Sequence, residues 1–228
     1  MNTLSSLNQT IISCTKCPRL VAFREKVAVE KRRMYRGEEY WGRPVPGWGD
    51  PKARVYIVGL APAAHGGNRT GRVFTGDSAG DFLFGALYRA GFANQPTSRA
   101  RGDGLQLRDV YIGAAARCAP PDNKPLPSEF ANCFPYLERE FEFLPNVRVL
   151  IGLGAIGFNA ILKLLAAHRI VLPRPLPKFG HNAVYRIANY SVIGTYHPSR
   201  QNTNTGRLTA PMFDRTFQMA RQELANDG

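Results

Sequence analysis

The stretch Arg54–Asp77 constrains the fold more than any other part of this chain. It begins with RVYIVGL, an apolar run rich in β-branched residues that is typical of a strand buried on both faces. From Leu60 the run gives way to a polar loop, LAPAAHGGNRTGRVFTGD, which contains four glycines. In open α/β sheets such loops follow the carboxyl ends of buried strands, where ligands bind. The sequence therefore predicts a functional site at the end of this strand.

The rest of the chain alternates apolar runs with helical patterns. Further strands are expected over Asp109–Arg117, Val147–Leu153 and a hairpin of Val184–Ala188 with Ser191–Tyr196. Helices are expected between them, and two more, within residues 3–12 and 19–30, precede the first strand. This order predicts an α/β fold in which a mostly parallel sheet is flanked by helices on both sides. Without a repeat or a clear linker, residues 1–228 are expected to form a single domain.

The charge of the chain indicates a polyanionic partner. It has 30 Lys and Arg against 17 Asp and Glu, a formal net charge of +13, and the arginines are spread along the sequence. A folded basic surface usually binds nucleic acid, and a merely solvated surface is the alternative. The connection 31–53, expected to lack regular structure, either faces DNA or covers the sheet edge. No leader or membrane-length apolar run is apparent, so a cytoplasmic protein without a membrane partner is expected.

Four cysteines form a pair, Cys14 and Cys17, and two distant members, Cys118 and Cys133. In a reducing compartment a CxxC pair followed by proline indicates a metal or redox site. A redox pair is expected at a strand-to-helix turn, whereas this pair lies between two helices, so a metal is favoured. The spacing suits zinc and an iron–sulfur cluster equally well, and four unrelated buried thiols are the remaining alternative. Either metal would fix the N-terminal helices, residues 1–30, to the loop after the second strand.

Three segments, together with the cysteine spacing, resemble the iron–sulfur family 5 of the uracil-DNA glycosylase superfamily. They are GLAPAAHGGNRTGRVFTGD at 59–77, CAPPDNKP at 118–125 and HPSRQNTNTGRLT at 197–209, and the likeness extends over nearly the whole chain. The resemblance implies a 4Fe-4S cluster on the four cysteines. It also implies a uracil-DNA glycosylase-like fold, a three-layer α/β/α sandwich with a central four-stranded, mostly parallel sheet. It also implies a monofunctional DNA glycosylase of base excision repair that removes uracil, and other deaminated or damaged bases, to leave an abasic site. The partner would be double-stranded DNA containing such a base, and the enzyme a monomer at a prokaryotic nucleoid.

Two positions depart from the wider superfamily. Ala61 stands where other families carry an acidic or amide residue that activates water, and Ala114 stands where family 4 carries a base-reading asparagine. Both departures are features of family 5 itself. Other residues of this chain must therefore perform the two tasks.

Breaking the bond between a base and deoxyribose leaves a cation-like sugar and an anionic base. His197 ends a buried strand and precedes a proline, and its ring is expected to donate an N–H to the departing base. A structural histidine is the alternative. Asp77, the carboxylate nearest to Ala61, is expected to activate water or to balance the sugar cation, and it can also cap the following helix.

The flipped base also needs a pocket that stacks on its face and reads its edge. Phe74 is expected to stack on the base, and simple packing within the loop is the alternative. Asn123 is expected to read the edge of the base, and an Asx turn is the alternative. The backbone amides of Gly66 and Gly67 would add donors, and His65 would contact the substrate.

Several residues are predicted to hold the DNA strand. Phosphate contacts are expected from arginines and from the loop after Ser199, with Leu208 as an apolar wedge. The predicted DNA-contacting residues are Arg69, Arg72, Arg200, Gln201, Asn202, Arg207 and Leu208. A different class of function is also open, namely a basic, metal-stapled module that binds nucleic acid without catalysis.

Overall fold

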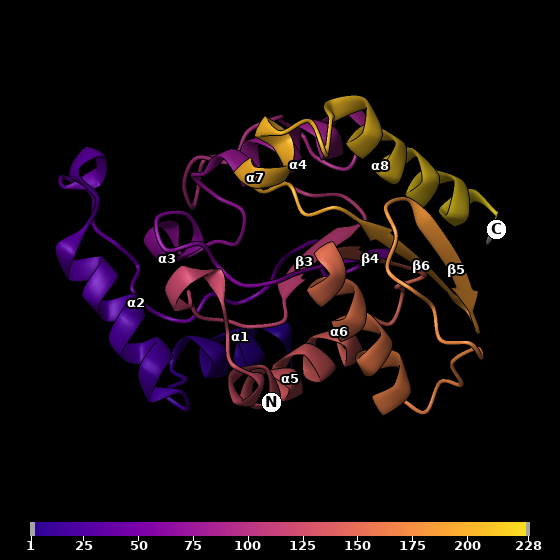
Figure 1. The fold of residues 1–228 in the computed structure, drawn as a ribbon, viewed down its shortest axis with the longest axis horizontal. Coiled ribbons are helices and arrows are strands. Elements are labelled where there is room, and N and C mark those ends of the chain that lie inside the picture. Colours follow the sequence, from indigo (N-terminus) through magenta and orange to yellow (C-terminus); the bar gives the residue numbers. More distant parts are fainter. Residues whose placement is uncertain (1–2, 227–228) are drawn as a thin grey trace.

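The computed structural model describes residues 3–226 of the chain. Its centre is a six-stranded mixed sheet with the strand order β1-β3-β2-β4-β6-β5 (Figure 1). The strands are β1 (Trp48–Gly49), β2 (Val55–Gly59), β3 (Val110–Ala114), β4 (Val149–Leu153), β5 (Ala183–Ile187) and β6 (Tyr190–Thr195). The four inner strands are parallel, and the edge strands β1 and β5 pair antiparallel with their neighbours.

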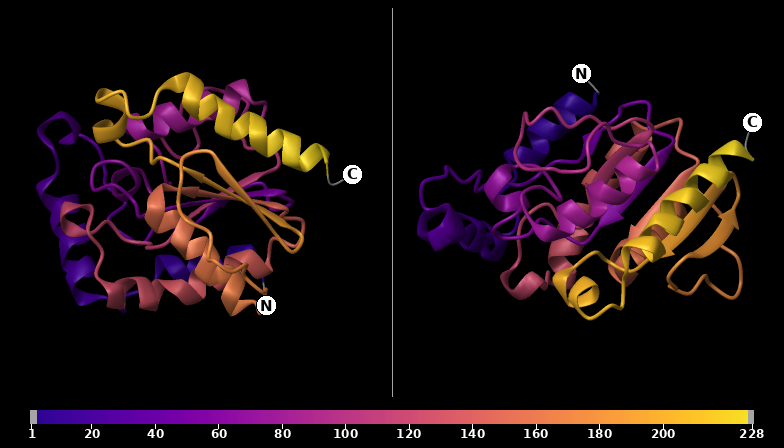
Figure 2. Two further views of the ribbon diagram at one scale, coloured as in Figure 1. Left: turned by 45° about the vertical axis from the view of Figure 1, so that its right-hand side comes forward. Right: turned by 90° about the horizontal axis from the view of Figure 1, so that it is seen from above.

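Helices cover both faces of the sheet, as the views in Figures 1 and 2 agree. The main helices are α1 (Leu4–Ile12), α2 (Pro18–Glu30), α4 (Ser78–Arg89), α5 (Pro127–Glu142), α6 (Gly154–Ala167) and α8 (Ala210–Ala225). Helices α4 and α8 supply Phe84 and Phe213 to the apolar cluster on one face. Helices α5 and α6 supply Leu137 and Phe158 to the cluster on the other. The predicted α/β/α sandwich is therefore confirmed.

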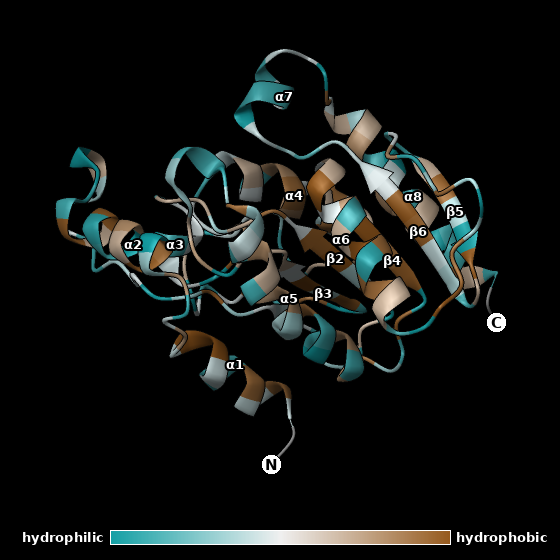
Figure 3. Ribbon diagram, turned by 60° about the horizontal axis from the view of Figure 1, so that its bottom comes forward, coloured by the Kyte–Doolittle hydropathy of each residue, from teal (hydrophilic) through white to brown (hydrophobic). Residues whose placement is uncertain are grey.

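The inner strands are apolar at every position because both of their faces are covered. Along β2, Val55 and Ile57 belong to the cluster under α4 and α8, whereas Tyr56 and Val58 belong to the cluster under α5 and α6. All five residues of β2, β3 and β4 are buried. Figure 3 shows these strands as the brown, hydrophobic centre of the molecule. This burial explains why continuous apolar runs, rather than alternating patterns, marked them in the sequence.

The sheet has six strands rather than the four predicted. One addition is the first arm of the expected hairpin, which forms the edge strand β5. The other is the two-residue strand β1, inside the connection 31–53 that was predicted to be irregular. Gly49 permits this pairing, because its φ is +140° and a side chain there would collide with the carbonyl oxygen of Val110. That connection also contains the short helical turn η1 (Arg33–Tyr35).

The polar loops leave the sheet at the carboxyl ends of its parallel strands. The register pairs Gly59 with Ala114, and Leu153 with Thr195, so the carboxyl ends of the parallel strands lie together. The loop after β2 coils into the short helix α3 (Gly67–Thr70), and the loop after β6 into α7 (Arg200–Asn204). The loop after β3 contains the turn η2 (Pro121–Asn123). None of the helices within residues 3–226 is long and apolar enough to span a membrane.

Candidate active site

Two predicted site residues, Phe74 and His197, meet at the carboxyl edge of the sheet. Their ring centroids lie 5.7 Å apart, although β4 separates the strands from which their loops start. Phe74 has a φ of +53°, and a Cβ at Gly59 would stand 2.9 Å from its ring, so only glycine at the end of β2 leaves room for it. The structure therefore brings the first and third motifs together, as predicted.

His197 is half-buried just after the end of β6. Burial lowers its pKa to about 4, so the imidazole is neutral at neutral pH and keeps one N–H to donate. The amide of Asn202 donates a 2.8 Å hydrogen bond to the backbone carbonyl of His197. Gly154 begins α6 next to His197 with a φ of +79°, and a Cβ there would lie 3.4 Å from the Cβ of His197. These features suit a neutral hydrogen-bond donor.

Asp77 caps α4, and its two carboxylate oxygens have different surroundings. Oδ1 accepts a 2.9 Å hydrogen bond from the backbone N–H of Gly80. Oδ2 lies against Gly66, where any side chain would collide with it. Burial raises the pKa of the carboxyl, and the backbone N–H groups of Gly80 and Ala79 oppose that rise. The geometry is thus compatible with Asp77 capping α4 through one oxygen and acting on water or on the sugar cation through the other.

His65 and the adjacent glycines lie in the same loop. The hydroxyl of Tyr40 is 3.0 Å from Nδ1 of His65, and the two rings meet edge to face. Burial lowers the pKa of His65, and the charges of Arg32 and Arg69 lower it further. Gly66 and Gly67 are buried.

Asn123 is not brought into contact with Phe74 or His197. It is exposed at the end of η2 with a φ of +55°, and its backbone N–H bonds to Pro120. No hydrogen bond links its side-chain amide to another residue within 3–226. Its reading of a base therefore stays a prediction.

The residues after Ser199 lie on the surface beside this site. Arg200 and Gln201 are exposed on α7, which Figure 3 shows as a hydrophilic helix above the sheet. Arg200 donates a 3.0 Å hydrogen bond to the hydroxyl of Ser78, the first residue of α4. Arg207 is exposed and its guanidinium lies 4.7 Å from the ring centroid of Tyr196. These positions are compatible with contacts to a DNA strand.

Three predicted DNA contacts conflict with the structure. Arg69 and Arg72 are only 7% and 8% exposed, and Leu208 is 1% exposed within the core. Arg72 pairs with Asp103 at 2.8 Å and stacks on Trp48, while Arg69 pairs with Glu38. Both guanidinium groups are engaged inside the protein, so neither is free for a phosphate, and Leu208 is not available as a wedge.

The four cysteine side chains line one small cavity. Cys14 follows α1, Cys17 precedes α2, Cys118 follows β3 and Cys133 lies in α5. All four are free thiols, and no group of three or more His, Cys, Asp or Glu side chains in the described part of the chain is arranged to hold a metal ion. Burial raises the pKa of Cys118 to about 11 and also raises that of Cys133.

Two polar side chains aim at the sulfur atoms. Arg24 is 4% exposed and donates hydrogen bonds to Cys118 Sγ at 3.0 Å and to the carbonyl of Cys14 at 3.2 Å. The amide of Asn132 lies 3.4 Å from Cys17 Sγ. A buried cation beside a cysteine sulfur fits a negatively charged thiolate cluster. Arg24 was not predicted, although it lies on α2 seven residues after Cys17, which is the spacing of two helical turns.

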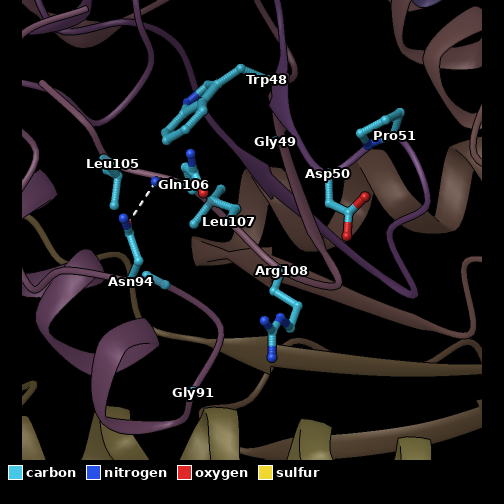
Figure 4. A pocket seen from close by; sticks show the side chains of 11 residues that line it. Trp48, Gly49, Asp50, Pro51, Gly91, Asn94, Leu105, Gln106, Leu107 and Arg108 are labelled. Atoms are coloured by element: carbon cyan, nitrogen blue, oxygen red, sulfur yellow. Dashed lines mark hydrogen bonds between the residues drawn. The ribbon is translucent and has the colours of Figure 1, made fainter. Parts of the chain in front are cut away.

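A larger cavity lies at the other end of the sheet. It has a volume of about 670 Å³ and is lined by residues that precede β2 and β3, among them Asp50, Asn94, Gln106 and Arg108 (Figure 4). Ligands of open α/β sheets bind at the carboxyl ends of the strands, and this cavity lies at their amino ends. Its size therefore does not identify it as the active site.

Comparisons with known proteins agree with the motifs. Residues 46–221 match the family model described as the uracil DNA glycosylase superfamily. A protein of Thermus thermophilus named type-5 uracil-DNA glycosylase is 50% identical over 206 residues, which cover 90% of this chain and 91% of that protein. One of Mycobacterium leprae with the same name is 48% identical over 96% of this chain and 95% of its own length. A type-4 uracil-DNA glycosylase of Pyrobaculum aerophilum is 33% identical over 71% of this chain and 66% of its own. The chain thus belongs to the uracil-DNA glycosylase superfamily, and within it to the type-5 family.

Proposed function

We propose that this protein is a DNA glycosylase that hydrolyses the N-glycosidic bond of uracil in DNA and leaves an abasic site for base excision repair. The observation that carries the proposal is the meeting of Phe74 with a neutral His197 at the carboxyl edge of the sheet. Membership of the type-5 family supports the same reaction, because relatives about half identical to the chain are named for it.

The proposed chemistry divides between two side chains. As the bond breaks, negative charge develops on the base. The N–H of neutral His197 would stabilise this charge by a hydrogen bond, without transferring its proton to the base. Asp77 would then orient water or balance the positive sugar through the oxygen that does not cap α4. No lysine takes part in this scheme, so strand cleavage is not expected and the enzyme is monofunctional.

The proposed pocket holds the flipped base between elements of two motifs. Phe74 would stack on the ring, Asn123 would read its edge, and His65 with the amides of Gly66 and Gly67 would line the pocket. Ala61 and Ala114 provide neither an acid nor an amide. A pocket with so few selective groups would accept other deaminated bases besides uracil.

The cysteine cavity is the proposed site of a 4Fe-4S cluster. Its fit rests on four thiols from three separate parts of the chain around one cavity, and on the buried guanidinium of Arg24 against Cys118. The cluster would supply a covalent staple that joins α2, the loop after β3 and α5, and no catalytic step is assigned to it. The protein would act as a single-domain monomer on double-stranded DNA at the prokaryotic nucleoid.

The proposal is tested with an end-labelled duplex that contains one uracil. After incubation with iron-loaded protein and mild alkali, the labelled strand should break at the uracil, and a duplex with thymine at that position should stay intact. If the uracil strand stays intact while the protein still binds the duplex, the chain is instead a DNA-binding module without catalysis.

A further inference from the structure

A short basic segment projects from the molecule between α2 and β1. We call residues 31–36, with the sequence KRRMYR, the basic arm; it includes the helical turn η1. Figures 1 and 2 both show it at the extremity of the molecule, past the end of α2. Arg32, Arg33 and Arg36 are exposed, and Met34 is 67% exposed between them. The arm thus presents three guanidinium groups and one apolar side chain to the outside.

The arm is fastened to the loop that carries the active site. The guanidinium of Arg69 lies 3.9 Å from the ring centroid of Tyr35, pairs with Glu38 just beyond the arm, and donates a 2.7 Å hydrogen bond to the carbonyl of Gly76. Gly76 is the residue before Asp77. A single buried arginine therefore holds the base of the arm against the residue that precedes the proposed catalytic carboxylate.

A second link joins the arm to the same loop. The hydroxyl of Tyr40 bonds both to the backbone N–H of Arg32, at 3.3 Å, and to Nδ1 of His65, at 3.0 Å. Arg32 is also close enough for its charge to lower the pKa of His65. The arm is therefore fixed to the loop that contains His65 and Asp77.

The three arginines of the arm have no carboxylate partner among the described residues. No ion pair joins Arg32, Arg33 or Arg36 to a carboxylate within residues 3–226, and the nearby Glu38 is already paired with Arg69. Exposed guanidinium groups side by side repel one another, and a phosphate backbone relieves that repulsion. Met34 lies among them, and methionine is one of the apolar side chains that DNA-bending proteins insert between base steps.

We propose that the basic arm binds the backbone of double-stranded DNA beside the damaged nucleotide, and that Met34 packs against the bases left exposed when the target base is extruded. The second part rests on the proposed function, whereas the first does not. Met34 would take the position of wedge that the buried Leu208 is not free to occupy.

The backbone contact is tested by salt dependence. A variant with Arg32→Gln, Arg33→Gln and Arg36→Gln should bind an undamaged duplex with a shallower dependence of log Kd on log salt, the slope falling by about 1 to 3 because each lost phosphate contact removes about 0.9. The matched control is Arg169→Gln, Arg174→Gln and Lys178→Gln, three exposed cations in the loop between α6 and β5. An unchanged slope in the arm variant, or an equal fall in the control, would overturn the proposal.

Met34 is tested by comparing two substrates. Met34→Ala should slow uracil removal from a duplex by about tenfold but leave removal from single-stranded DNA unchanged, because only the duplex must be unstacked. Leu176→Ala, at an exposed apolar residue far along the chain, should change neither rate. Equal loss on both substrates would refute the assigned role. If the wild type removes no uracil at all, the proposed function fails, whereas the salt slope still decides whether the arm binds DNA.

Discussion

The two carboxylate oxygens of Asp77 have different surroundings, and one substitution can separate its helix-capping role from its proposed catalytic role. Asparagine caps a helix about as well as aspartate, so Asp77→Asn should change the free energy of unfolding by less than about 0.5 kcal/mol. It should nevertheless lower the excision rate by about 100-fold or more, because the amide carries no charge and accepts no proton. Single-turnover kinetics and urea unfolding measure the two effects.

The same helix supplies the control for Asp77. Asp81, in the first turn of α4, pairs with the exposed Arg99 at 3.4 Å. Asp81→Asn should leave both the rate and the stability nearly unchanged, since such surface pairs contribute little. A normal rate in Asp77→Asn would reduce that residue to its capping role.

The low pKa of His197 makes stability depend on pH. An unfolded histidine titrates near 6.5, whereas His197 titrates at about 4 because it is buried. Between these values the unfolded chain binds a proton that the folded chain does not, so its contribution to stability is lost as the pH falls. From pH 7.5 to pH 5.5 the loss should be about 1 kcal/mol.

His197→Gln removes this contribution, so the variant should lose about 1 kcal/mol less than the wild type over the same interval. Urea unfolding at the two pH values measures the difference, and the other titrating groups cancel in it. Equal losses in the two proteins would mean that the ring is well hydrated in the folded state.

The residues at strand ends were predictable, and the directions of loop side chains were not. Phe74 and His197 could be placed together because the carboxyl ends of parallel strands share one edge. The inward turn of Arg69 and Arg72 depends on Glu38 and Asp103, each 31 residues away in the sequence. No local pattern reveals such distant partners, so both arginines resembled surface cations.

Among the elements, α5 carries the buried carboxylate that joins three parts of the fold. Glu140 is fully buried and accepts two hydrogen bonds from Arg117, at 2.9 and 2.7 Å, just before Cys118. It also accepts from the hydroxyl of Tyr56 on β2 and from the backbone of Gly47. Glu140→Gln leaves the guanidinium buried without its counter-charge and should destabilise the protein by about 3 to 5 kcal/mol.

The control lies two residues further along the same helix, on its exposed side. Glu142 pairs with Arg139 at 3.0 Å, and both side chains are more than 40% exposed. Glu142→Gln should therefore change the free energy of unfolding by less than about 0.5 kcal/mol. If chemical denaturation shows similar small effects for both variants, the buried pair is not the link between α5 and the sheet.

The long elements followed from their patterns, and the short ones did not. Runs such as those of β2 and β4 are apolar throughout, because two layers of helices cover them. By contrast, β1 has two residues and α3 has four, too few for any periodicity to appear. Their conformation comes from neighbours, such as the pairing of Trp48 with Ile112.

At the scale of the whole molecule, the cysteine cavity and the active site are joined through α2. Arg24 donates to Cys118, and its backbone carbonyl accepts a 3.1 Å hydrogen bond from Asn68, a buried residue of α3. The helix α3 follows Gly66, which lies against Asp77. Loss of the proposed cluster should therefore loosen α2 and α3 before it affects the sheet.

Iron removal tests this order directly. When a chelator strips the iron, amide hydrogens of α2 and of residues 13–17 should exchange at least about tenfold faster, because α2 then keeps mainly its contacts away from the cysteines. These are the buried Leu20, the hydrogen bond from Asn68 to the carbonyl of Arg24, and the ion pair of Arg19 with Glu129. Amides of β2 and β4 should keep their protection, since two apolar clusters cover them, and α1 should lie between, anchored through Leu7 and Ile11 on Tyr136. Iron-free Cys17→Ser protein should show the stripped pattern from the start. Uniform loss would make the metal a determinant of the entire fold, and no loss would mean that the thiols hold no metal.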